Sequence, residues 1–168
     1  IMGDNKSKRS LKGEPRLKVQ LNEEQKEVLT KFYQHDINFV MGDFGSGKSL
    51  AAVYAAISSF RKKQFNKIWI TRPILKNTLA TLPGTIDDKM HPYVFPILQN
   101  LDICQGKEIT DRMRKQGTIE MMPISVAKGI TFVDSVVIVD EFQDMDYTDF
   151  RTILTRLGKG SKMIFCGS

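Results

Sequence analysis

At 168 residues, with 41% hydrophobic and 26% charged residues, the chain has the composition of one ordinary globular domain. No apolar stretch approaches the roughly 20 residues that span a bilayer, and the amino terminus lacks the apolar centre of a secretory signal. We therefore expect a cytoplasmic protein without a membrane partner. The two cysteines, Cys104 and Cys166, are too few and too far apart to suggest a disulfide framework or a zinc site.

The net charge of +6 is concentrated at the amino terminus. Residues 1–18 hold six basic and two acidic side chains, and so carry +4 of it. We interpret this segment as a flexible leader, the alternative being an arm that contacts phosphates. Residues 19–168 are then expected to form the folded domain. Its first helix is predicted to begin after Asn22, a suitable N-cap, with Gln25 completing a capping box.

Residues 42–49 read Gly-Asp-Phe-Gly-Ser-Gly-Lys-Ser and fit the phosphate-binding pattern G-x-x-x-x-G-K-[ST] at every specified position. They follow an apolar run at 39–41 and precede an alanine-rich helical pattern at 50–60, so we predict a strand, a loop and a helix. Such a loop turns backbone N–H groups toward an anion at the amino end of the helix. Lys48 is expected to reach the β- and γ-phosphates of ATP, and Ser49 to place its hydroxyl on Mg²⁺.

Gln25 lies 17 residues before Gly42 and has a second interpretation. It could hydrogen-bond the adenine edge, as an upstream glutamine does in many helicase motors. The capping role and the adenine role are both left open. The predicted ATP-binding residues are Gln25, Gly42, Asp43, Phe44, Gly45, Ser46, Gly47, Lys48, Ser49 and Leu50.

A second strand is predicted at 67–71, ended by Pro73, which cannot donate a hydrogen bond to the sheet. In a parallel sheet, the loops at the carboxyl ends of the strands form the ligand crevice. Thr71, Arg72 and Lys76 are therefore expected on the functional edge, unless they only lead the chain out of the strand.

The stretch 77–101 contains several prolines and is predicted to be a turn followed by a short, proline-bounded helix. A helix at 108–115 and a strand at 118–122 are predicted next. No partner residues suggest metal or triad chemistry for His91, so we interpret it as a structural residue.

Four consecutive aliphatic residues at 136–139 predict a strand buried on both faces, with Asp140 and Glu141 at its carboxyl end. Downstream of a phosphate loop, Asp140 is expected to hold Mg²⁺ through water, and Glu141 to orient and polarise the attacking water. Gln143 could sense the γ-phosphate. The alternative is that both carboxylates are solvated charges at a strand end. The predicted catalytic residues are Lys48, Glu141 and Gln143, and the predicted metal ligands are Ser49 and Asp140.

A helix at 147–157 and a strand at 161–166 complete the prediction. The expected fold class is α/β, with a mostly parallel sheet sandwiched by helices. Domains of this kind normally continue with at least one more strand, so we expect the C-terminal end of the domain 19–168 to be truncated.

Together these motifs resemble the PhoH-like protein family, which is related to the motors of superfamily 1 helicases. The resemblance covers about residues 20–168, and its most discriminating parts are the Leu-Pro-Gly to Pro-Tyr stretch and the Leu-Thr-Arg stretch. The matching segments are 42–49, 71–73, 82–84 with Lys89, 91–93 with Pro96, 140–143, 154–158 and 160–162.

The resemblance implies a RecA-like P-loop NTPase core, ATP hydrolysis with Mg²⁺, assembly into a homo-oligomeric ring and a role in RNA metabolism, with helicase activity proposed for some members. It also implies that Arg72 and Arg156 lie near the nucleotide or at a subunit boundary. Where the family tends to have Arg-Gly-Arg-Thr, residues 128–131 are Lys-Gly-Ile-Thr. A second arginine that could serve a neighbouring active site is therefore absent, and only Lys128 remains charged.

The leading hypothesis is a magnesium-dependent ATPase of P-loop type that couples hydrolysis to binding, translocation or remodelling of single-stranded nucleic acid, with RNA favoured over DNA. Thr71, Arg72, Lys76, Lys128 and Arg156 are the candidate residues for nucleic acid or subunit contacts. One alternative is a module that uses ATP only to set its oligomeric state. Another is a nucleoside kinase of the type II thymidine kinase kind, but that family carries a four-cysteine zinc module that two cysteines cannot supply.

Overall fold

A computed structural model of the chain describes residues 17–43 and 47–168. Most of the basic segment 1–18 and three residues of the phosphate loop, Phe44, Gly45 and Ser46, lie outside the described residues. The expectations that fall on them are neither supported nor contradicted by the structure. Among the described helices, none is long and apolar enough to cross a bilayer.

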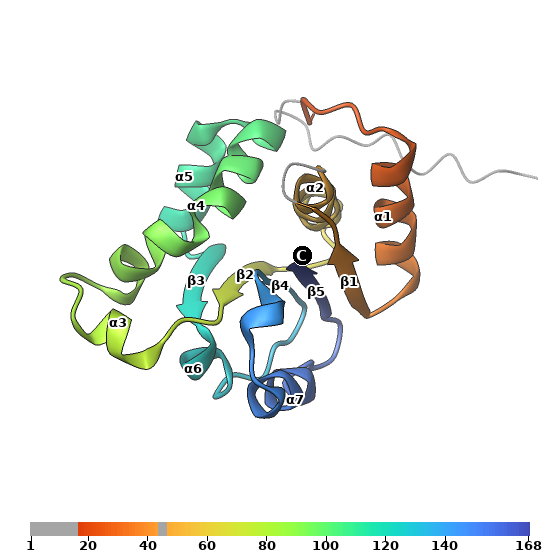
Figure 1. Cartoon of the computed structure of the whole chain (residues 1–168). Helices are drawn as coiled ribbons and strands as arrows, with labels where there is room; N and C mark the ends of the chain where they lie inside the picture. The colour runs from red at the N-terminus through yellow and green to blue at the C-terminus, as the bar shows by residue number, and fades with distance from the viewer. Residues whose placement is uncertain (1–16, 44–46) are drawn as a thin grey trace, which may run out of the picture.

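The centre of the described structure is a sheet of five parallel strands in the order β1-β5-β4-β2-β3 (Figure 1). The order places β5 between the strand that precedes the phosphate loop, β1, and the strand that ends at the carboxylates, β4. The strands are β1 (Ile37–Met41), β2 (Lys67–Arg72), β3 (Ile119–Pro123), β4 (Ser135–Val139) and β5 (Lys162–Gly167). This parallel arrangement confirms the expected α/β sheet. As a consequence, the carboxyl ends of all five strands lie at one edge of the sheet.

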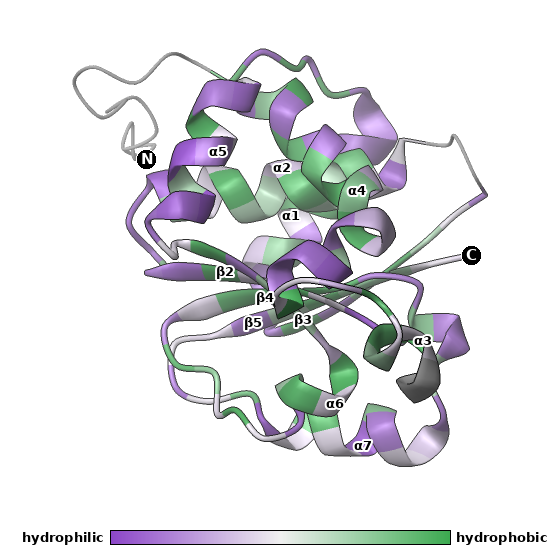
Figure 2. Ribbon diagram, turned by 90° about the vertical axis from the view of Figure 1, so that its left-hand side faces the viewer, coloured by the Kyte–Doolittle hydropathy of each residue, from purple (hydrophilic) through white to green (hydrophobic). Residues whose placement is uncertain are grey.

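Helices cover both faces of the sheet, and each face has its own apolar core (Figure 2). The helices over one face are α1 (Glu23–Gln34), α2 (Lys48–Arg61), α4 (Ile86–Gln105) and α5 (Lys107–Lys115). The opposite face packs against α6 (Ile124–Ala127) and α7 (Tyr147–Thr155). Two short elements, α3 (Lys76–Ala80) and the 3-10 turn η1 (Phe142–Asp144), follow β2 and β4. All residues of β4 are buried because both faces are covered.

The prediction of a short, proline-bounded helix within 77–101 is wrong. The structure has a 20-residue helix, α4, with Pro92 and Pro96 inside it. Thr85 and Asp88 form a capping box that starts this helix well before the prolines. A continuous apolar face then buries Met90, Val94, Ile97, Leu98, Leu101 and Cys104. Burial of this face outweighs the roughly 3 kcal/mol that each of the two interior prolines costs the helix.

Candidate nucleotide-binding site

The phosphate loop joins the end of β1 to the start of α2, as its pattern predicts. At one end, the Gly42 N–H donates to the carbonyl oxygen of Gly167 at 3.1 Å, which ties the loop to the end of β5. At the other end, Gly47 is the N-cap of α2 and has a φ of 77°, in the left-handed region that favours glycine. Its carbonyl accepts from the Ala51 N–H at 3.1 Å, and this bond begins the helix at Lys48.

Gln25 makes the predicted capping box and also contacts the phosphate loop. Its Oε1 accepts from the Asn22 N–H, and its own N–H donates to Asn22 Oδ1, both at 2.9 Å. Its Nε2 donates to the carbonyl oxygen of Gly47 at 3.1 Å. Oxygen and nitrogen of this buried carboxamide thus both have protein partners. A carboxamide oxygen can accept two hydrogen bonds and its nitrogen can donate two, so these contacts leave one position free on each atom and the adenine role of Gln25 stays a prediction.

A pocket of about 370 Å³ lies between the phosphate loop, the ends of β4 and β5, and the middle of α4. It brings together predicted residues that are far apart in the sequence, among them Lys48, Asp140 and Glu141. The full lining is Val40, Gly42, Asp43, Gly47, Lys48, Ser49, Leu50, Pro96, Gln99, Asn100, Asp140, Glu141, Gly167 and Ser168. Cationic, hydroxyl and carboxylate groups therefore face one space at the carboxyl edge of the sheet, where ligands of such sheets bind.

The two carboxylates differ in their surroundings. Asp140 is 7% exposed and its backbone N–H donates to the Thr71 carbonyl at 2.9 Å, which fixes it beside the end of β2. Burial raises the pKa of Asp140 to about 6; the neighbouring Glu141 charge adds to this, while the Glu141 N–H and Arg72 oppose it. Glu141 is less buried and adopts a left-handed backbone with φ of 51°. Gln143 Nε2 donates to the Glu141 carboxylate, so the two predicted catalytic residues are in contact.

The described side chains also fit a magnesium ion of the kind that accompanies ATP. Ser49 and Asp140 line the same pocket and offer the hard oxygen ligands that Mg²⁺ prefers. No group of three or more His, Cys, Asp or Glu side chains in the described part of the chain could hold a metal by itself. A magnesium ion here would therefore take its other ligands from nucleotide phosphates and water.

The family model that describes PhoH-like proteins matches residues 18–168 of this chain. The chain belongs to the PhoH-like protein family. A PhoH-like protein of Bacillus subtilis is 35% identical over 145 residues, covering 85% of this chain and 46% of that protein. A PhoH-like protein of Synechocystis is 32% identical over 146 residues, covering 85% of this chain and 44% of that protein. The chain thus spans less than half the length of these curated relatives.

Solved structures show the fold of this PhoH-like chain. The SWI2/SNF2 ATPase core of Sulfolobus solfataricus, solved in complex with dsDNA, has a TM-score of 0.60 at 12% identity. The match covers 92% of this chain and 34% of the Sulfolobus chain. The large terminase of a thermophilic bacteriophage has a TM-score of 0.55 at 14% identity, covering 89% of this chain and 39% of its own. Together with the sheet order, these likenesses confirm the RecA-like α/β fold.

Among the residues predicted for nucleic acid or subunit contacts, Thr71 and Arg72 lie beside the pocket. Thr71 is fully buried, and its Oγ1 has no hydrogen-bond partner among the described residues. Arg72 Nη1 donates to the Tyr93 carbonyl at 2.8 Å, and its guanidinium carbon lies 5.9 Å from the centre of the Tyr93 ring. Arg72 therefore fastens the end of β2 to α4, the helix that supplies one wall of the pocket.

The other three predicted contact residues of the PhoH-like chain are not gathered at the pocket. Lys128 Nζ pairs with Asp149 Oδ1 at 2.7 Å, which joins the end of α6 to α7 on the opposite face of the sheet. Arg156 follows α7, and its carbonyl accepts from Phe132 N–H near the edge where the strands begin. That edge is opposite to the phosphate loop, and the implied subunit contact of Arg156 stays a prediction. The side chain of Lys76 lies outside the described side chains.

Sequence reasoning missed the contribution of α4 to the site. Pro96, Gln99 and Asn100 line the pocket opposite Lys48 and Glu141. Neither the Gln99 nor the Asn100 side chain has a hydrogen-bond partner among the residues that the structure describes. Two neighbouring carboxamides inside an apolar helical stretch are the available sequence signal. The sequence does not show that this helix packs opposite the phosphate loop, because that depends on contacts between distant segments.

Proposed function

We propose that this PhoH-like chain is an ATP-binding ATPase whose domain spans residues 19–168. The proposal rests on one observation: Glu141, whose carboxylate accepts from Gln143 Nε2, lines the same pocket as Lys48, Ser49 and Asp140. A loop that only binds an anion would need the phosphate-loop residues of that pocket and no carboxylate opposite them. A carboxylate beside the phosphate-binding groups, held by a second side chain, is what hydrolysis by water requires.

In the proposed reaction, water attacks the γ-phosphorus of ATP in line with the oxygen that bridges to the β-phosphate. The bond to that bridging oxygen breaks, ADP leaves, and the carboxylate of Glu141 takes the proton that the water loses. Gln143 holds the carboxylate in place through its Nε2, and Lys48 neutralises charge on the transferred group. Magnesium, held by Ser49 and Asp140 when bound, supplies further charge neutralisation at the phosphates.

We further propose that hydrolysis is coupled to single-stranded nucleic acid, with RNA favoured over DNA, in a cytoplasmic homo-oligomer. Family membership supports the coupling, as does the similarity in fold to an ATPase core solved in complex with dsDNA. The position of Arg156, at the edge of the sheet away from its own phosphate loop, is compatible with a contact to another subunit. A module that uses ATP only to set its oligomeric state remains the alternative.

Steady-state ATP hydrolysis by the full-length protein tests the proposal, measured alone and with single-stranded RNA or DNA. The Glu141→Gln variant is the blank, because it keeps the shape of the side chain but cannot accept a proton. Stimulation by one polymer above this blank supports a nucleic-acid-coupled motor and names its substrate. Hydrolysis without stimulation retains the ATPase and refutes the coupling; nucleotide-dependent assembly without turnover supports the alternative.

A further inference from the structure

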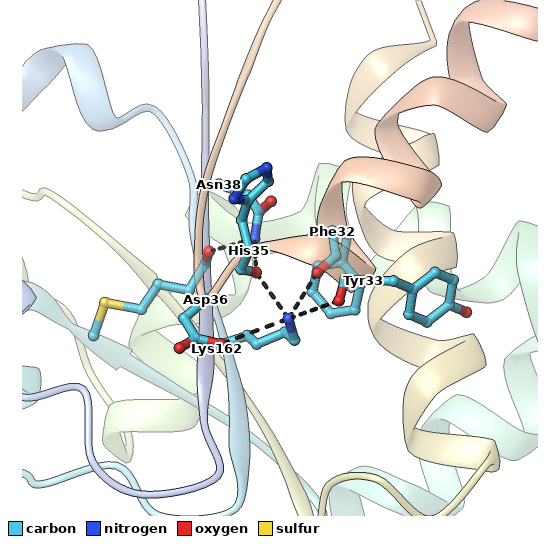
Figure 3. Close-up of polar contacts among 7 residues, drawn as sticks. Phe32, Tyr33, His35, Asp36, Asn38 and Lys162 are labelled. Atoms are coloured by element: carbon cyan, nitrogen blue, oxygen red, sulfur yellow. Dashed lines mark hydrogen bonds and ion pairs between the residues drawn. The ribbon is translucent and has the colours of Figure 1, made fainter.

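Lys162, the first residue of β5, reaches across to the carboxyl end of α1 (Figure 3). Its Nζ donates to the carbonyl oxygens of Phe32 at 2.9 Å and His35 at 2.8 Å, and lies 3.5 Å from that of Tyr33. The ammonium is also 5.4 Å from the centre of the Phe32 ring and 3.7 Å from Asp36 Oδ1. Only 16% of the side chain is exposed, so this is a partly buried charge surrounded by acceptors.

This contact gives α1 a cap that comes from a distant part of the chain. The last carbonyl groups of a helix lack intrahelical donors and carry the negative end of its dipole, so a cation is stabilising there. The adjoining backbone is tied to β5 as well: Met163 N–H donates to the Asp36 carbonyl at 2.8 Å. Lys31, which belongs to the last turn of α1 itself, instead pairs with Glu27 at 3.1 Å on the exposed surface.

The amino end of the same helix carries Gln25, whose Nε2 donates to the carbonyl of Gly47. The C=O of Gly47 and the N–H of Lys48 belong to one planar trans peptide and so point in opposite directions. Because the carbonyl is directed toward Gln25 and Ala51, the Lys48 N–H is directed the other way, toward the N-terminal side of α2, where such a loop is expected to hold an anion. The bond from Gln25 on α1 therefore acts with the bond from Ala51 on the peptide that carries this backbone donor.

We propose that Lys162 is a positioning residue for nucleotide binding, acting through α1 and Gln25 on the phosphate loop; the proposal rests on the proposed ATP-binding function. Lys162 and Gln25 stand at opposite ends of a 12-residue helix, which is about 18 Å long, and share no contact. Lys162 holds the carboxyl end of α1 against β5, and Gln25 holds its amino end against Gly47. Release of the first end lets the second move away from the loop.

The test is a double-mutant cycle on the full-length protein, with affinity for a fluorescent ADP analogue as the readout. Lys162→Met removes the ammonium at similar length and is expected to weaken binding roughly threefold to tenfold, the size of a helix-terminus charge effect. In the Gln25→Ala background, where the link to the loop is already broken, the same substitution is expected to weaken binding less than twofold. Lys31→Met is the matched control, because Lys31 is in the same turn but its ammonium pairs with Glu27 on the exposed surface, and it should leave affinity unchanged.

Unchanged affinity for the analogue in Lys162→Met overturns the inference. An equal loss of affinity in the wild-type and Gln25→Ala backgrounds also overturns it, because the free-energy effects of independent, distant substitutions are additive. Amide exchange separates this result from failure of the ATP-binding proposal. If the wild-type protein does not bind the analogue, the positioning role is tested instead by hydrogen exchange of the Ala51 amide, which donates to the Gly47 carbonyl. Faster exchange in Lys162→Met but not in Lys31→Met supports the positioning role, and equal exchange in both refutes it.

Discussion

Replacement of Gly47 by alanine tests the geometry of the phosphate loop directly. Gly47 has a φ of 77°, a conformation that costs an L-residue about 1–2 kcal/mol. A Cβ built on it would lie 2.7 Å from Gln25 Nε2, closer than nonbonded atoms approach. Gln25 must therefore move, and its hydrogen bond to the Gly47 carbonyl, typically worth about 1 kcal/mol, is lost.

The two effects together amount to about 2–3 kcal/mol, which corresponds to roughly a 30- to 150-fold change in an equilibrium constant. If the loop keeps its conformation, the loss falls on the free energy of unfolding. If the loop relaxes, a bound nucleotide must restore it, and the loss falls on affinity. The sum of the two losses is therefore the quantity to measure, by urea unfolding and by titration with a fluorescent ADP analogue.

Gly129→Ala is the matched control for this substitution. A Cβ at Gly129 would meet only the Val126 carbonyl at 3.5 Å, an ordinary contact, and its φ lies outside the left-handed region. We expect this variant to unfold and to bind as the wild type does. A Gly47→Ala variant with both free energies within about 0.5 kcal/mol of wild type would refute the described loop geometry.

Three further outcomes are expected. Glu141→Gln should retain bound nucleotide and lose roughly 100-fold or more in single-turnover hydrolysis, because its side chain cannot accept the proton; undiminished turnover would assign the water to another group. Gln99→Ala and Asn100→Ala should each change the kcat or KM of ATP hydrolysis at unchanged unfolding free energy, and kinetics identical to wild type would remove α4 from the site. Cys104 is buried and burial raises the pKa of its thiol to about 12, so it stays protonated at pH 8 and should resist iodoacetamide until urea is added; rapid labelling of the folded protein would contradict its placement.

Local patterns in the sequence determined the elements around the phosphate loop. A glycine-rich loop between an apolar run and an alanine-rich helix has few structural solutions, so β1 and α2 were predicted correctly. The capping box at Asn22 and Gln25 was predicted as well, because it involves residues only three apart. The aliphatic run of β4 indicated a strand buried on both faces, and the carboxylates at its end were placed at the correct edge.

Only the tertiary structure decided the features that depend on contacts between distant segments. Proline statistics predicted a short helix, whereas burial of a long apolar face keeps α4 continuous through Pro92 and Pro96 and brings Gln99 to the pocket. Gln25 has a capping role that the sequence indicates, but its bond to Gly47 requires α1 to pack beside the loop. Lys162 caps a helix more than 120 residues away in the chain. Hydrogen bonds of this kind depend on how the helices pack on the sheet, and local patterns in the sequence do not predict that packing.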